Sequence, residues 1–122
     1  MRRRTLKRQR QEYKYRNNRS RFIEDQRSLD KRGNVYCIFC GNVIKQEEPD
    51  LHHGDGRDDE ELLDESLWFL ADNYCHVTQY HGMSCLDIPW WNDYVNRIKI
   101  THPTIYEKEL RRQEKAEYGK RK

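Results

Sequence analysis

Residues 34–56 read NVYCIFCGNVIKQEEPDLHHGDG, a stretch with a Cys-x-x-Cys pair and, twelve residues later, two adjacent histidines. Cys37 and Cys40 have the spacing at which two thiolates bind one tetrahedral zinc ion from a tight backbone turn, a zinc knuckle. His52 and His53 lie on a segment that resembles a strand, so their side chains are expected to point to opposite sides. The stretch therefore predicts a zinc knuckle followed by a strand that carries histidines.

The composition limits the size of the hydrophobic core. Of the 122 residues, 34% are hydrophobic and 37% are charged. Such a chain forms one domain at most and needs a source of stability besides apolar burial, usually a structural metal ion. No segment resembles a signal peptide or a membrane span, because the longest apolar run is LWFLA at 67–71. We therefore expect a cytoplasmic protein with no membrane contact, whose reduced cysteines bind metal.

Charge is strongly segregated along the chain. Residues 1–32 carry 13 Lys or Arg against 4 Asp or Glu, and residues 97–122 carry 9 against 4. Residues 33–96 carry 2 basic side chains against 13 acidic ones. Two basic arms thus flank an acidic middle, and we expect the arms, with Arg16 and Arg19 among their cations, to bind nucleic-acid phosphates. A solvated helix surface is the alternative explanation.

Apolar periodicity predicts the order of the elements. Residues 1–32 lack Gly and Pro and are expected to form a charged helix with a narrow apolar stripe at Tyr15, Phe22 and Leu29. Further along the chain we expect short strands in 35–44, 50–53 and 66–71, a loop at 54–65, and helices at 72–83, 89–100 and 104–122.

This pattern predicts three segments. They are a basic helical arm at 1–32, a zinc-stabilised domain at 33–100, and a basic helical tail at 101–122. Trp90 and Trp91 are expected to cover the small core, with base stacking as the alternative.

Two further cysteines extend the set of zinc ligands. Cys75 begins the helix that would return beside the knuckle, and it is the expected third ligand. Two residues are candidates for the fourth zinc ligand. Cys85 offers a thiolate, the chemically better ligand, whereas Asp72 lies where a second Cys-x-x-Cys would start. The alternative is that Cys75 and Cys85 are small buried apolar residues.

Two more histidines follow within the expected helix. His76 lies 23 residues after His53, and His81 lies five residues after His76, near enough to one helical turn for both to approach one ion. With His52 from the strand, they would leave coordination positions open, as a catalytic ion requires. His53 would then face a substrate water. Adjacent histidines on a polar loop without a function are the alternative.

The motifs CIFC, DLHH and SLWFLADNYCHVTQYH, within residues 35–82, resemble those of the HNH nucleases. The resemblance implies an α+β fold, with a small ββα-metal core and a structural zinc knuckle between charged terminal helices. It also implies an endonuclease that hydrolyses phosphodiester bonds in DNA, similar to small HNH proteins of bacteriophages. On this resemblance, one divalent ion (Mg²⁺, Mn²⁺, Ni²⁺ or Zn²⁺) is held by His52, His76 and His81, and His53 is the general base.

Several positions differ from the HNH pattern or have no fixed place in it. The family's central asparagine has no clean match, and Ser66 and Asn73 are the two candidates. Asp72 stands where the family has a cysteine, and His81 follows His76 by five residues where the colicin-type branch has four. Arg57 could contact the scissile phosphate, with a solvated loop arginine as the alternative.

A non-catalytic zinc module that binds nucleic acid or a protein partner is the alternative function. The two hypotheses differ at His53, because a binding module has no use for an unligated histidine beside a metal site. A structural zinc protein within a larger assembly would explain the charged helices but not the paired histidines.

Overall fold

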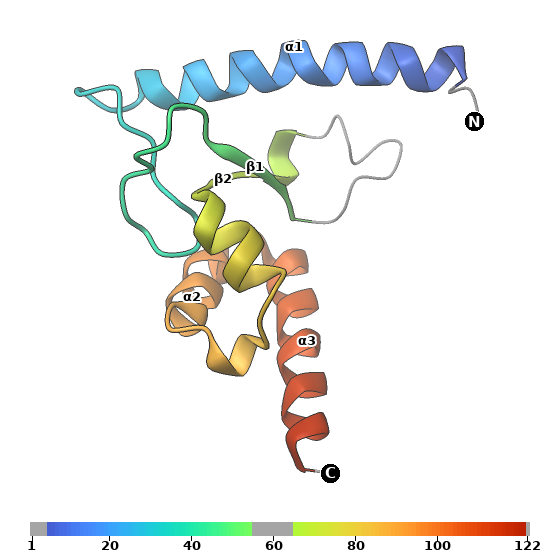
Figure 1. Cartoon of the computed structure of the whole chain (residues 1–122), viewed down its shortest axis with the longest axis vertical. Coiled ribbons are helices and arrows are strands. Elements are labelled where there is room, and N and C mark those ends of the chain that lie inside the picture. Colours follow the sequence, from blue (N-terminus) through green and yellow to red (C-terminus); the bar gives the residue numbers. More distant parts are fainter. Residues whose placement is uncertain (1–4, 55–64, 122) are drawn as a thin grey trace.

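A two-stranded antiparallel sheet lies between the long N-terminal helix and the C-terminal helices (Figure 1). The computed structural model describes residues 5–54 and 65–121. Strand β1 (Asp50–His53) pairs with β2 (Trp68–Ala71), and His52 faces Phe69 across the pair. The other elements are α1 (Leu6–Ser28), the 3-10 helix η2 (Glu65–Leu67), the π-helix η3 (Tyr74–Tyr80), the 3-10 helix η4 (Cys85–Asp87), α2 (Trp91–Thr101) and α3 (Pro103–Arg121). The α+β class is confirmed, and the loop predicted at 54–65 lies mostly outside the described residues.

The cysteine knuckle is held by turns rather than by two regular strands. Only an isolated bridge joins Tyr36 to Val43, instead of the strand pair predicted within 35–44. Backbone hydrogen bonds close the segment, from Cys37 to the Asn42 carbonyl at 2.9 Å and from Ile44 to the Val35 carbonyl at 2.8 Å. The chain turns too tightly around the cysteines for longer strands to form.

Helix α1 begins where the Thr5 hydroxyl caps it by accepting from the Arg8 amide at 3.1 Å. The middle of the helix docks on β2, since the rings of Tyr15 and Phe22 lie edge-on to Trp68 with centroids 5.6 and 5.4 Å away. Leu29 was predicted to continue this apolar stripe. It is 81% exposed, because the helix ends at Ser28 and Leu29 lies beyond its last turn.

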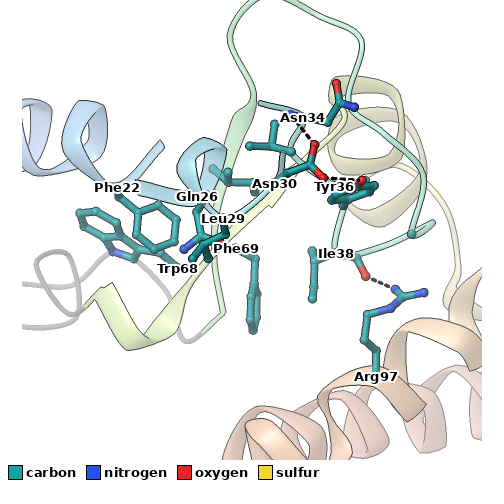
Figure 2. A pocket seen from close by; sticks show the side chains of 14 residues that line it. Phe22, Gln26, Leu29, Asp30, Asn34, Tyr36, Ile38, Trp68, Phe69 and Arg97 are labelled. Carbon is teal, nitrogen blue, oxygen red and sulfur yellow. Dashed lines mark hydrogen bonds between the residues drawn. The ribbon is translucent and has the colours of Figure 1, made fainter. Parts of the chain in front are cut away.

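A cavity of about 430 Å³ separates the C-terminal end of α1 from the knuckle and β2 (Figure 2). Polar groups at its edge are bonded within the chain: Asp30 accepts from the Asn34 amide at 2.9 Å, and Arg97 donates to the Ile38 carbonyl. The cavity therefore offers an apolar wall instead of converging polar groups. Because the cavity lies under the end of α1, only the middle of this helix packs closely on β2.

Helix α2 and the residue before it supply three of the buried aromatic side chains, Trp90, Trp91 and Tyr94. Helix α2 buries Trp91, Tyr94, Val95 and Ile98, the four residues that the periodicity places on one face. Trp90 is also buried, and its indole nitrogen donates to Gln79 at 2.6 Å. Both tryptophans therefore belong to the core, as predicted. None of the helices in the described parts is long and apolar enough to cross a membrane.

Candidate metal centres

Three thiols converge beside the knuckle. The sulfur atoms of Cys37, Cys40 and Cys75 lie within 4.8 Å of one another, and these residues form the thiol centre. The first two meet because the Gly41 amide donates to the Cys37 carbonyl at 2.9 Å, with Gly41 at a φ of 80° that favours glycine. Cys75 joins them from the first turn of η3. The predicted return of this helix to the knuckle is confirmed.

The thiol centre suits a soft divalent cation. Burial raises the pKa of both Cys37 and Cys75, so these thiols keep their protons at neutral pH unless a cation displaces them. Thiolate ligands favour zinc over the hard cations Mg²⁺ and Ca²⁺. The three residues therefore fit the structural zinc ion that the sequence predicts, and one further ligand would complete a tetrahedron.

Cys85 does not belong to this group, so its prediction as a zinc ligand is corrected. The hydroxyl of Ser84 caps the short helix η4, in which Cys85 is buried. The charge of Arg112 on α3 acts on the Cys85 thiol there. Asp72 also lies outside the group, but it lines one cavity together with Cys40 and Cys75. Its Oδ1 accepts from the Tyr74 amide at 2.9 Å, and the second carboxylate oxygen could bind an ion without loss of that bond.

Three histidine rings converge on the other side of η3. Ligand atoms of His52, His76 and His81 lie within 4.8 Å of one another, and these residues form the histidine centre. His76 Nε2 lies 3.3 Å from His52 Nδ1 and 3.2 Å from His81 Nε2. Two nitrogens bound at about 2.0–2.1 Å to one tetrahedral ion lie about 3.3–3.4 Å apart. The observed separations match that geometry, so the donor set fits a divalent ion.

The π-helical turn explains the five-residue step between two of these ligands. In a regular α-helix, residues five apart differ in direction by about 140°. Here the His81 amide donates to the His76 carbonyl at 3.1 Å, the i to i+5 bond of a π-helix. The wider turn places both rings on one face.

Burial favours the neutral form of two of the three histidines, His52 and His81. Burial lowers the pKa of His52 well below its usual value, and charge on His76 and His81 lowers it further. Burial also lowers the pKa of His81, with the charges of His76 and Arg112 as smaller causes. Neutral imidazoles keep the lone pairs that a cation needs. The lowered pKa values of His52 and His81 therefore favour the form of these two rings that binds an ion.

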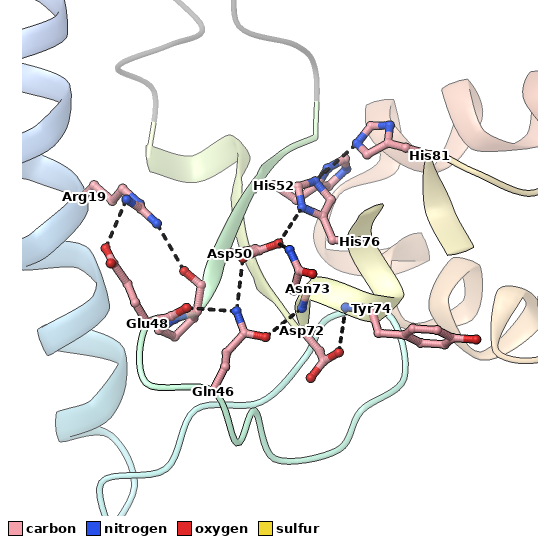
Figure 3. A network of polar contacts seen from close by, with 11 residues as sticks. Arg19, Gln46, Glu48, Asp50, His52, Asp72, Asn73, Tyr74, His76 and His81 are labelled. Atoms are coloured by element: carbon pink, nitrogen blue, oxygen red, sulfur yellow. Dashed lines mark hydrogen bonds and ion pairs between the residues drawn. The ribbon is translucent and has the colours of Figure 1, made fainter. Parts of the chain in front are cut away.

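A carboxylate orients the central ring of the histidine centre (Figure 3). Asp50 Oδ2 lies 3.3 Å from His76 Nδ1, the ring nitrogen on the far side from the other histidines. Asn73 donates to the same oxygen at 2.9 Å, and Gln46 donates to the other carboxylate oxygen at 3.0 Å. A carboxylate on the outer nitrogen of a metal-binding histidine fixes the ring and makes it a stronger ligand. Sequence reasoning missed Asp50, although it lies two residues before His52 on the same face of a strand.

Replacing Asp50 by asparagine is expected to weaken ion binding at the histidine centre by about 10- to 100-fold, because the His76 ring loses its contact with a negatively charged carboxylate. Calorimetric titration with Ni²⁺ measures this affinity. Asp93→Asn, which removes an exposed carboxylate from the first turn of α2, is the matched control. An unchanged affinity in Asp50→Asn would contradict the orienting role.

His53 lies on the opposite side of β1, under α1. Its Nε2 and the Tyr15 hydroxyl are hydrogen-bonded at 3.0 Å, its ring centroid lies 6.1 Å from Trp68, and the residue is 9% exposed. The predicted alternation of His52 and His53 is confirmed. The prediction that His53 faces water is corrected, because the apolar residues in the middle of α1 bring Tyr15 over it.

The other predicted site residues lie in different surroundings. Asn73 ties β1 to the start of η3 through Asp50, whereas the backbone carbonyl of Ser66 accepts from His102 at 2.9 Å. These two residues are the candidates for the HNH asparagine, and the side chain of Asn73 bonds to the strand pair through Asp50. Both assignments stay predictions.

The predicted phosphate-binding arginines are also divided. Arg19 donates to the Pro49 carbonyl at 3.2 Å and pairs with Glu48 at 3.1 Å, while Arg16 is exposed on α1. Arg57 lies outside the described residues. Sequence reasoning missed Lys108 of α3. Its ammonium donates to the Gly54 carbonyl, directly after β1, at 3.1 Å, and its charge helps to lower the pKa of His52.

Comparison with protein-family models, with curated proteins and with solved structures finds no match for this chain.

Proposed function

We propose that this protein is a metal-dependent endonuclease of the HNH type, which hydrolyses phosphodiester bonds in DNA. The convergence of the histidine centre on one strand pair and the following helix carries the proposal. A further histidine, His53, lies on the opposite side of the same strand. The thiol centre would hold a structural zinc ion and fix the helix that supplies two of the histidines. Basic side chains of α1 and α3 would bind phosphates with little sequence preference.

In this reaction, His52, His76 and His81 would hold one divalent ion, which would supply stabilisation of negative charge on the phosphate and on the departing 3′ oxygen. Three imidazole ligands favour Zn²⁺ or Ni²⁺ over Mg²⁺. His53 accepts a proton from a water molecule aligned with the phosphorus atom, a task suited to a group that titrates near neutral pH. No covalent intermediate with the protein is needed.

The proposal requires α1 to move away from His53. Tyr15 and Phe22 hold the helix on Trp68, and the ion pair of Arg21 with Glu65 at 2.7 Å adds an exposed contact. Exposed ion pairs contribute little stability, and DNA phosphates compete for the same arginine. DNA binding to α1 would therefore weaken the cover over the general base.

Plasmid cleavage with Ni²⁺, Mn²⁺ or Mg²⁺ tests the proposed function. His53→Ala is expected to lower the cleavage rate by about 10²- to 10⁴-fold, because the general base is lost, while ion binding at the histidine centre persists. His102→Ala is the matched control, since His102 lies outside the histidine centre. Equal nicking by wild type and His53→Ala would rule out this role.

A non-catalytic zinc module that binds nucleic acid is the second candidate. The burial of His53 against Tyr15 favours it, because a binding module does not need an accessible imidazole. This function predicts salt-sensitive DNA binding without cleavage under any of the metal conditions above.

A further inference from the structure

The thiol centre and the histidine centre are built from the same short segments. Cys75 and His76 are consecutive residues of η3, yet each belongs to a different centre. The knuckle is shared as well, because Phe39 lies between Cys37 and Cys40 in the sequence and its side chain turns toward the histidines. A displacement of η3 relative to the knuckle would therefore disturb both centres.

Phe39 provides the direct contact between them. The residue is fully buried, and its ring centroid lies 5.1 Å from that of His52 and 6.2 Å from that of His76, stacked on the latter at 17°. The ring also stacks on Tyr80 at 4.9 Å, and Tyr80 lies edge-on to His81 at 4.9 Å. An ion that fixes the two knuckle cysteines thus fixes the ring against which the histidine centre is packed.

We infer that a cation in the thiol centre strengthens cation binding at the histidine centre, with Phe39 as the positioning residue between them. Both ions favour the same placement of η3 against the knuckle, so the first one bound removes conformational freedom that the second would otherwise have to remove. The inference rests on the metal centres of the proposed function but requires no nuclease activity.

Charge does not oppose this coupling. A divalent ion held by three thiolates forms a group with a net charge of −1, which does not repel a second cation. The histidine centre contributes neutral ligands, so a charged ion there gains from the negative group beside it. Ordering and charge therefore act in the same direction, and the coupling is positive.

The test measures Ni²⁺ affinity at the histidine centre by calorimetry, with the thiol centre loaded with zinc. Cys40→Ser removes a half-buried thiol ligand and is expected to weaken Ni²⁺ binding by about 5- to 150-fold, the usual range of coupling between sites. Cys85→Ala, a buried thiol outside the thiol centre, is the control and should match wild type. A folded Cys40→Ser protein with wild-type Ni²⁺ affinity would overturn the inference.

A second variant decides the question if circular dichroism shows that Cys40→Ser does not fold. Phe39→Leu keeps every ligand and an apolar side chain but removes the shared ring, so the zinc-loaded variant should bind Ni²⁺ more weakly than wild type. Phe22→Leu, which changes a ring that contacts Trp68, is the matched control. Unchanged Ni²⁺ affinity in Phe39→Leu would overturn the coupling.

These outcomes are separate from failure of the proposed nuclease. Ni²⁺ binding without coupling would remove only this inference. A wild-type chain that binds no Ni²⁺ at its histidines would remove the histidine centre, and with it both proposals. Coupled ion binding in a protein that never cleaves DNA would keep the inference and remove the nuclease.

Discussion

Cys75→Ser is expected to leave the chain largely unfolded, because it removes the only thiol-centre ligand that comes from η3. Structural zinc contributes about 10–16 kcal/mol to the folding of small zinc domains. A whole domain is stable by only about 5–15 kcal/mol, so loss of the ion is comparable to the entire stability. Thermal unfolding followed by circular dichroism should show no cooperative transition in this variant. Adding a zinc chelator to the wild type should have the same effect.

Cys85→Ala is the control for this experiment. Cys85 is as deeply buried as Cys37, at 2% exposure, but it lies outside the thiol centre. Its replacement removes one sulfur atom from the core, which costs about 1 kcal/mol and lowers the melting temperature by a few degrees. If Cys75→Ser melts within a few degrees of Cys85→Ala, the thiol centre does not stabilise the fold through an ion.

The periodic and turn-bounded parts of the fold could be predicted from sequence. The strand at 50–53 and the strand ending at Ala71 were both expected, as was a helix at 89–100, where α2 lies. Cys37 and Cys40 were paired by their spacing, because a tight turn at Gly41 leaves the knuckle few other geometries, and Cys75 was added because it begins the helix expected to return beside the knuckle. Local constraints of this kind are visible in the residues themselves.

The surroundings of the site residues depended on long-range packing. Nothing in the sequence near His53 indicates that Tyr15, 38 residues earlier, lies over it. The position of Cys85 depends on how η4 meets α3, and the π-helical bond at His81 follows no propensity of its sequence. Sequence spacing could therefore group the ligands of each centre, but it could not say which side of the strand α1 covers.

His76→Ala is expected to abolish both ion binding at the histidine centre and DNA cleavage. His76 is the middle ligand, with its Nε2 within 3.3 Å of a nitrogen of each of the other two. An ion at the reacting phosphate supplies several kcal/mol of charge stabilisation, and about 4 kcal/mol already corresponds to a thousandfold in rate. Cleavage should fall to the level of a reaction without protein, and Ni²⁺ should no longer bind at this centre.

The fold of His76→Ala should persist, because the thiol centre keeps all three of its ligands. His102→Ala, which changes a histidine outside both centres, should bind Ni²⁺ and cleave as the wild type does. Comparison with His53→Ala separates the two roles: the His53 variant keeps the ion and loses the base, whereas the His76 variant loses the ion. Cleavage that survives in a folded His76→Ala protein would place the reaction elsewhere on the chain, since the remaining His52 and His81 do not form a three-ligand centre.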